Sequence, residues 1–325
     1  TAAVLVEDGW TAEMAIPIKS LRYPSRGATE AHRWGFQVQR EIRGKDEVVT
    51  WVPVSTKVLG FMPQMGTLDG IQNLSTARNL EIMPTVTAVQ VGRMNTAGAF
   101  LNDDVEEGGL NLKYGLTSNF TIDFTYNPDF SQIESDRPQI EVNQRFPLLF
   151  AELRAFFLEG KEVYQIAGPV TYLHTRTILD PRFGAKITGK MGKSQIGILL
   201  ADDEAPGRLD NPLDPAFGRS AQAFIGRIKT DIYRESHLGF MFADREFMDS
   251  YSRIAFLDGG FRLGSSARYA FQVALSDRKD LNGVRHTGPV LNMDFRKDGR
   301  NLTYFGAHNE IHPEYGNDLG FIRRV

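Results

Sequence analysis

Cysteine is absent from all 325 residues, which excludes a disulfide framework and zinc sites with cysteine ligands. No apolar run reaches the roughly 18 residues that a transmembrane helix needs. This second absence does not exclude membrane-spanning β-strands, because such strands are short and alternate in polarity. No block of Lys and Arg stands out, and the net charge is −3 with both signs interspersed. A nucleic-acid partner is therefore not expected.

Glycine and phenylalanine, by contrast, are abundant, with 31 and 22 residues. Hydrophobic residues make up 42% and charged residues 24%, which is typical of a folded chain. Many glycines and aromatics suit a β-rich protein that needs turns and interfacial rings. The chain opens at Thr1 inside a patterned segment and stops at Val325 inside another. We therefore expect it to be truncated at both ends, so that a missing signal peptide is uninformative.

Alternation of apolar and polar residues is the dominant pattern. Phe120, Ile122 and Phe124 are separated by Thr121 and Asp123. The same period of two recurs in 110–116, 183–191, 268–276 and 291–296. This pattern predicts antiparallel strands with one apolar face and one polar face.

The number and length of these strands favour a barrel. From residue 80 onward we find roughly a dozen strand candidates, many of about ten residues, as in membrane strands. Short turns at 117–119, 192–194 and 297–299 contrast with a long polar stretch at 202–219. A soluble β-sandwich also alternates and stays the alternative. The predicted fold is all-β: a partial outer-membrane-type antiparallel barrel over 78–325, preceded by part of a β-sandwich.

The first 60 residues form a separate predicted region. Two strands are expected at 7–21 and 34–43, and the mixed segment 61–77 is predicted to be a linker. All three tryptophans lie in this region, at Trp10, Trp34 and Trp51. Their rings could stack on sugars, although a buried core position is the commoner role for tryptophan in a sandwich.

A resemblance to a known module supports this division. The sequence GWTAEMAIPIKSLRY at 9–23 resembles the last part of a family 9-like carbohydrate-binding domain. Trp34-Gly35-Phe36 and Arg40 fit the closing strands of that domain. The resemblance implies that residues 1–60 are the C-terminal part of a periplasmic sugar-binding-like sandwich.

The following region resembles a bacterial domain of unknown function, DUF5916, which commonly follows such a module. Its signature is matched by NPDFSQIESD at 127–136 and by FFLEG at 156–160. This resemblance implies an outer-membrane-type barrel. The family usually shows Glu-Lys-Arg-Pro before the Phe pair, whereas this chain has Glu152-Leu153-Arg154-Ala155. A role that depends on that lysine is therefore not assigned here.

Segment 127–165 interrupts the alternation. It contains Pro128, Pro138 and Pro147, and proline is excluded from the interior of central strands. Irregular backbone at membrane depth is tolerated where protein or a water-filled lumen surrounds it. We therefore expect 128–165 to fold inward as a plug or to lie across the barrel mouth.

This segment also carries charged residues of both signs that could form an anchoring network. The network candidates are Asp129, Glu134, Asp136, Arg137, Arg145 and Arg154. In an extended chain Glu134 and Asp136 would lie about 7 Å apart on one face, which suits a glycosidase pair. Nearby arginines lower a carboxyl pKa, whereas a general acid needs a raised one. An ion-pair network is thus the favoured interpretation, and catalysis by these two residues is the alternative.

His308, Glu310 and His312 alternate along one predicted strand. Imidazole and carboxylate groups on one face can bind zinc, but a polar rim gives the same pattern. No metal and no cofactor are predicted.

The leading hypothesis is an outer-membrane barrel protein with a periplasmic module that binds glycans. Its predicted partners are a glycan or oligosaccharide and outer-membrane lipid. Whether it also admits or processes glycans is left open. The alternatives are a membrane-associated glycoside hydrolase acting on O-glycosyl bonds and a soluble all-β glycan-binding protein.

Overall fold

The structure is a computed structural model of the whole chain. It describes residues 1–7, 9–18, 23, 26–27, 29–55, 61–74, 80–94, 100–117, 119–128, 150–233, 235–299 and 301–322. The chain divides into two compact units. The first comprises Thr1–Thr56, Gly60–Asn79 and Gly115–Asn119, and the second comprises Lys57–Leu59, Leu80–Tyr114 and Phe120–Val325. No helix in the described ranges is long and apolar enough to cross a membrane.

The N-terminal unit consists of two-stranded antiparallel sheets. They pair β1 (Ala2–Val6) with β2 (Gly9–Glu13), β3 (His32–Phe36) with β6 (Gly66–Ile71), and β4 (Gln39–Ile42) with β5 (Glu47–Thr50). Among the described residues of the strand expected over 7–21, Gly9–Glu13 forms a strand, and it completes a hairpin with β1. The segment predicted as a linker contributes β6.

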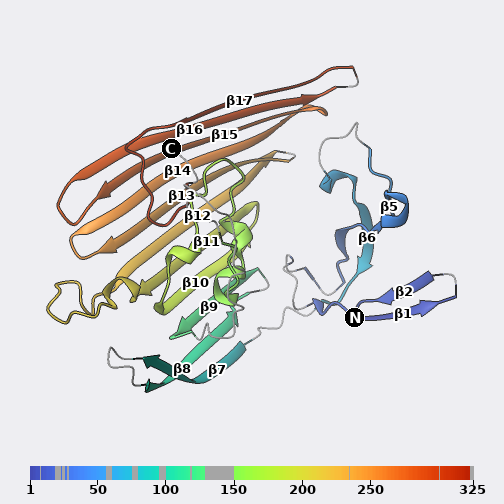
Figure 1. Cartoon of the computed structure of the whole chain (residues 1–325). Helices are drawn as coiled ribbons and strands as arrows, with labels where there is room; N and C mark the ends of the chain where they lie inside the picture. Colours follow the sequence, from blue (N-terminus) through green and yellow to red (C-terminus); the bar gives the residue numbers. More distant parts are fainter. Residues whose placement is uncertain are drawn as a thin grey trace. The chain divides into compact units, whose positions relative to one another are not determined.

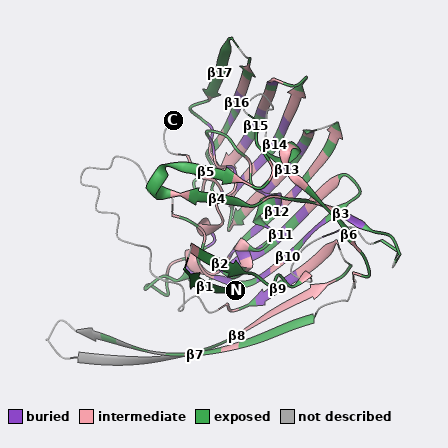
Figure 2. Ribbon diagram, turned by 90° about the vertical axis from the view of Figure 1, so that its right-hand side faces the viewer, coloured by how far each residue is buried: buried purple, intermediate pink, exposed green. Residues whose placement is uncertain are grey.

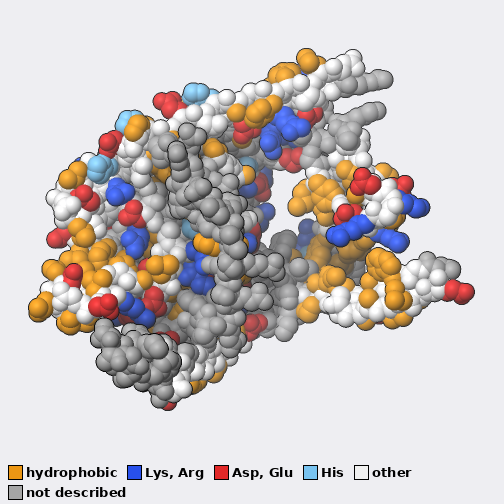
Figure 3. Space-filling model, in the orientation of Figure 1, with side chains coloured by type: hydrophobic (Ala, Val, Ile, Leu, Met, Phe, Trp, Pro, Cys, Tyr) orange, Lys and Arg blue, Asp and Glu red, His pale blue; other side chains and the backbone are white. Residues whose placement is uncertain are grey.

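Hydrophobic side chains remain on the surface of this unit (Figure 3). Leu5, Trp10 and Trp51 are exposed, whereas Tyr23 and His32 are buried. Two-stranded sheets have too little area to cover a row of apolar side chains. The described N-terminal residues therefore enclose only a small core around Tyr23.

The second unit is dominated by one 11-stranded sheet in which neighbouring strands also follow one another in the chain (Figure 1). Its strands are β7 (Leu80–Met94), β8 (Phe100–Gly115), β9 (Phe120–Tyr126), β10 (Pro181–Met191), β11 (Ser194–Asp203), β12 (Ala221–Tyr233), β13 (Ser236–Phe247), β14 (Ser250–Leu263), β15 (Ala267–Lys279), β16 (Arg285–Asp298) and β17 (Thr303–Ile311). The all-β antiparallel fold is confirmed. In the described ranges no pairing joins β17 to β7, so the sheet is open.

One face of this sheet, the outer face, carries an apolar row that crosses several strands. Ile228 pairs with Phe240, Phe240 with Leu257, and Leu257 with Val273. Phe240, Leu257 and Val273 are 47%, 44% and 41% exposed. These cross-strand neighbours pack side by side within the sheet and are not covered by a second sheet. Apolar residues at alternate positions therefore point outward, as the period of two predicts.

The opposite face, the inner face, is buried, and Figure 2 shows buried and exposed positions alternating along these strands. It is covered by two stretches of chain, residues 150–180 and 312–322, which we call the inner layer. The inner layer includes α1 (Ala155–Leu158) and the short 3-10 turns η4 (Lys161–Val163) and η5 (Thr175–Thr177).

A single hydrophobic core fills the space between the inner face and the inner layer. The inner layer contributes Phe157, Val163, Tyr164, Val170, Tyr172, Ile178, Tyr315 and Leu319. The sheet contributes Leu199, Ala201, Ala223, Ile225, Met241, Ala243, Ile254, Phe256, Ala274 and Val290. The inner face is therefore more apolar than the predicted polar lumen.

The two ends of the sheet differ in their connections. Tight turns join β10 to β11, β12 to β13, β14 to β15 and β16 to β17 at one end, which we call the short-turn end. The other end carries the two long connections, from β9 to β10 and from β11 to β12, the second of which contains η6 (Ala205–Gly207). The connections from β13 to β14 and from β15 to β16 at that end are short. Leu80, the first residue of β7, pairs with Tyr114 near the end of β8. The chain therefore enters the sheet at the short-turn end.

Candidate functional site

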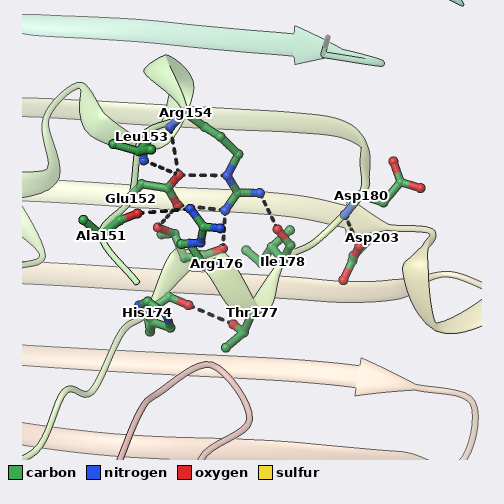
Figure 4. A network of polar contacts seen from close by, with 11 residues as sticks. Ala151, Glu152, Leu153, Arg154, His174, Arg176, Thr177, Ile178, Asp180 and Asp203 are labelled. Carbon is green, nitrogen blue, oxygen red and sulfur yellow. Dashed lines mark hydrogen bonds and ion pairs between the residues drawn. The ribbon is translucent and has the colours of Figure 1, made fainter. Parts of the chain in front are cut away.

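A buried ion pair holds the start of the inner layer (Figure 4). The Arg154 guanidinium donates to both carboxylate oxygens of Glu152, at 2.8 and 2.7 Å. It also donates to the carbonyl oxygens of Ile178 and Thr175, at 2.5 and 2.7 Å. The Thr175 hydroxyl completes the group by donating to Glu152 at 2.6 Å. These bonds join residues 152–154 to the turn η5.

The charge state of this group follows from its contacts. Burial alone raises the pKa of Glu152, but the hydrogen bonds from Arg154 and Thr175 and the charge of Arg154 outweigh it, so the pKa is lowered. Burial, together with the arginines Arg176 and Arg154, lowers the pKa of the neighbouring His174. Glu152 is therefore ionised and His174 neutral at neutral pH. This arrangement favours a fixed ion pair over an acid–base catalyst.

Leu153, one of the two positions at which the chain departs from the family pattern, lies beside this pair. Leu153 is 43% exposed, and only its backbone N–H donates to Glu152, at 3.1 Å. Glu152 and Arg154, which match the pattern, make the buried contacts. A lysine at position 153 would therefore reach solvent without changing the ion pair.

The FFLEG motif at 156–160 caps a buried lysine of the sheet. The Lys186 side chain is 1% exposed, and its ammonium donates to the carbonyl oxygens of Phe156 and, at 2.6 Å, of Glu159. Its ammonium nitrogen also lies 3.5 Å from the Asp123 carboxylate. Gly160 has a φ of +67°, which favours glycine, and a side chain there would meet Thr188. The motif thus has a structural role against β9 and β10.

A second buried ion pair lies within the sheet itself. The Arg227 guanidinium donates to both oxygens of Asp258, at 2.5 and 3.1 Å, and His237 Nε2 lies 3.4 Å from the same carboxylate. A Cβ at Gly239 would come within 2.4 Å of the Asp258 carboxylate. Glycine at this position therefore leaves room for the ion pair.

Polar side chains of the inner face bind the inner layer mostly through its backbone. Gln272 donates to the Ala167 carbonyl at 2.5 Å, and Asn292 donates to the Tyr172 hydroxyl at 3.3 Å. Burial raises the pKa of Tyr172, so that hydroxyl stays protonated. In the other stretch, the N–H of Gly316 donates to Ser276 at 3.2 Å. The groups gathered here hold chain segments together.

Only one residue of the predicted charged network lies in the described part of the chain. Of the predicted network, Arg154 lies in the inner layer, while Asp129, Glu134, Asp136, Arg137 and Arg145 fall outside the described residues. The proposed catalytic pair therefore stays a prediction. The described part of the predicted plug, 150–165, belongs to the inner layer, which extends further, to 180, and adds 312–322.

The predicted metal candidates do not form a cluster. His308 Nε2 lies 3.5 Å from Glu310 on the exposed strand β17. His312 instead accepts the N–H of Glu314 at 3.2 Å through its Nδ1. Throughout the described ranges no group of three His, Asp or Glu side chains gathers as a metal site.

The tryptophans occupy different environments. Trp51 lines a shallow pocket of about 330 Å³ together with Phe36, Val38, Arg40, Val49 and Thr50. The guanidinium carbon of Arg40 lies 5.2 Å from the centre of the exposed Trp10 ring. Trp34 is half-buried, with its ring centre 5.9 Å from that of Tyr23. Of the three, Trp51 and Trp10 are accessible to a ligand.

Lys186 and Asp258 were not singled out from the sequence as site residues, and alternation placed Gln272 inward without giving its partner, although each of the three makes a buried contact. The sequence feature that could have indicated such a contact is a polar residue at an inward position of a clearly alternating strand, such as Lys186 in the run 183–191. A partner distant in the chain decides whether such a residue faces water or is buried. That information is absent from the local pattern.

An antiparallel sheet with an exposed apolar outer face, and an inner face covered by other segments of the same chain, defines an all-β protein. Residues 78–177 match the family model described as "Domain of unknown function (DUF5916)". The match falls within the region whose sequence resembles this family, and it supports that resemblance over residues 78–177.

Solved structures that are similar to this chain include OmpT, an outer membrane protein of Vibrio cholerae. Its in-vitro folded trimer form is 7% identical with a TM-score of 0.29, and the match covers 76% of this chain and 95% of that chain. Outer-membrane expressed OmpT of Vibrio cholerae is 9% identical with a TM-score of 0.28, over 77% of this chain and 94% of that chain. Among curated proteins no relative matches this chain.

Proposed function

We propose that this chain is part of an outer-membrane β-barrel protein. The observation that carries the proposal is the exposed apolar row on the outer face, from Ile228 through Phe240 and Leu257 to Val273. Water-soluble proteins rarely expose large continuous apolar surfaces. Lipid covers such a surface on a transmembrane barrel, whose strands are apolar outside.

Aromatic residues near the short-turn end support the same proposal. On β14 and β15, the ring of Phe261 stacks with those of Tyr269 and Phe271, at centre distances of 6.4 and 6.2 Å. On β16 and β17, Phe295 stacks with Tyr304 at 5.6 Å. Rings at one level of neighbouring strands match the aromatic girdle at a membrane interface.

The connections suggest an orientation. Outer-membrane barrels have short periplasmic turns and longer extracellular loops. By this rule the short-turn end faces the periplasm. Because the chain enters β7 at that end, residues that precede Leu80 would also be periplasmic. This fits the periplasmic location expected for the N-terminal unit.

The test is to locate the full protein in fractionated cells and to compare its gel mobility with and without heating. We expect it in the outer membrane, with a mobility that changes on heating because a folded barrel resists detergent at room temperature. Recovery in the soluble periplasmic fraction, with a single mobility, would reject the membrane proposal and favour the soluble glycan-binding alternative.

Glycan binding by the N-terminal unit is a second candidate function. The pocket lined by Phe36, Arg40 and Trp51 supports it, because exposed rings can stack on the apolar face of a sugar. The test is binding of the full protein to a polysaccharide panel, comparing Trp51→Ala with Leu5→Ala, a control at another exposed apolar position. Equal binding by both variants would remove the pocket from this function.

A further inference from the structure

The two stretches of the inner layer are joined to each other. The backbones of Thr171 and Phe321 exchange two hydrogen bonds, at 3.2 and 2.8 Å. The N–H of His174 donates to the carbonyl of Leu319 at 2.7 Å, and Asn317 donates to that of Tyr172 at 2.8 Å. Residues from before β10 and after β17 thus form one body.

Glycines of the inner face let this body approach the sheet closely. A Cβ at Gly184 would lie 2.9 Å from the Phe156 ring, and one at Gly197 would lie 2.7 Å from the Tyr164 ring. On β16, a Cβ at Gly288 would lie 2.4 Å from the backbone nitrogen of Tyr315. Contacts this close leave no room for a layer of water, since even one water molecule needs a cavity with polar partners.

Side chains of the inner face of the sheet then bind the inner layer. Lys186 on β10, Gln272 on β15 and Ser276 on β15 each bond to inner-layer backbone. Ser252 on β14 accepts the N–H of Asp318 at 3.1 Å. Breaking these bonds together would expose buried polar groups and the apolar core between them, at a cost that grows with each unmade bond.

We infer that the inner layer is a permanently seated plug, and that no aqueous path runs between it and strands β10–β16. This inference rests on the proposed membrane location, because only in a barrel does the inner face line a lumen. Solutes, glycans included, then do not cross the membrane along the inner face of strands β10–β16. Any admission of glycans has to run elsewhere in the protein.

The natural absence of cysteine allows a direct test by thiol labelling of the protein in its native outer membrane. Three single-cysteine variants sample three environments: the adjacent residues Ser276→Cys on the inner face and Leu275→Cys on the outer face, and Ser265→Cys in the exposed turn between β14 and β15. Each is treated with a charged, water-soluble thiosulfonate and, separately, with a lipid-soluble maleimide. Ser252→Cys serves as a second inner-face variant, and heat-modifiable mobility shows that each variant is folded.

We expect Ser265→Cys to react with the charged reagent, and both inner-face cysteines to remain unlabelled until the protein is denatured. Leu275→Cys should react only with the lipid-soluble reagent. Rapid labelling of folded Ser276→Cys or Ser252→Cys by the charged reagent, with Leu275→Cys still protected from it, would overturn the plug inference alone. Labelling of Leu275→Cys by the charged reagent would instead overturn the membrane proposal.

Discussion

Glu152 and Arg154 show how single residues join distant parts of the inner layer. Both side chains are largely withdrawn from water, with the Arg154 guanidinium also 4.3 Å from the centre of the Phe157 ring. Removing a charge from water is unfavourable, and the two partners offset that cost only while both are present. The pair therefore contributes to the specific position of η5 more clearly than to net stability.

Replacing Glu152 by Gln should destabilise the protein by on the order of 3 kcal/mol, because Arg154 would be left buried without a counter-charge. The measurement is the midpoint of urea unfolding in lipid vesicles. The matched control is Leu153→Lys, which alters the exposed neighbour and restores the residue usual in the family. It should shift stability by less than about 0.5 kcal/mol. Equal effects of the two changes would contradict the role given to the ion pair.

The same pair predicts a pH dependence. Because the folded pKa of Glu152 lies below its ordinary value of 4.5, its stabilisation is present above that pH and is lost as the pH falls through the folded pKa. The stability difference between the natural protein and Glu152→Gln should therefore be constant near neutral pH and shrink in acid. Unfolding midpoints across a pH series measure it, and a difference that grew in acid would contradict the assignment.

Among the elements, strand β11 carries apolar residues on both of its faces, although the two faces have different surroundings. Its outward residues Ile198 and Leu200 are exposed, whereas its inward residues Leu199 and Ala201 are buried against the inner layer. Such a strand reads as continuously apolar, as buried strands do. Gly197 interrupts this run at a point where a Cβ would lie 2.7 Å from the Tyr164 ring of the inner layer.

Gly197→Ala should destabilise the protein by about 1–3 kcal/mol, because the added methyl group overlaps Tyr164 and Val163. Gly226→Ala on β12 is the matched control, since a Cβ there meets only the Phe224 ring, at 3.4 Å. Urea midpoints of both variants give the comparison. A destabilisation confined to Gly226→Ala would show that the inner layer does not pack as described.

At the scale of the whole molecule, the two faces of the sheet have different surroundings. The outer face exposes an apolar row, and the inner face encloses a core that is closed by chain from two separate places in the sequence. In water the outer face would favour aggregation. In lipid the same face would match its surroundings, so the proposed membrane location concerns the outer face and not the core.

Phe240→Arg should therefore impair insertion into lipid by about 2–4 kcal/mol, the cost of a lipid-facing arginine near the middle of a barrel. Ser265→Arg, in an exposed turn, should have little effect. The fraction of protein that folds into vesicles of defined lipid, followed by its heat-modifiable mobility, measures both. Efficient folding of Phe240→Arg would place that residue outside the membrane.

The local sequence sufficed for the strands and for the faces of those with clean alternation. Val273 and Leu275 point outward and Gln272 and Ser276 inward, as the period of two requires, because successive side chains of a strand alternate in direction. The FFLEG motif lies in the inner layer and not in the sheet, whereas Pro138 and Pro147 fall outside the described residues. Of the candidate sites, the sequence located Arg154 but not the partners that hold it.

Tertiary structure alone decided what lies on the inner face. Nothing in the local pattern of 312–322 indicates that it pairs with Thr171, or that Lys186 is buried under the carbonyls of Phe156 and Glu159. Strands that are apolar on both faces, such as β11, cannot signal by periodicity which side meets lipid and which meets protein. Periodicity is a property of adjacent residues, whereas burial depends on segments far apart in the chain that only the folded molecule brings together.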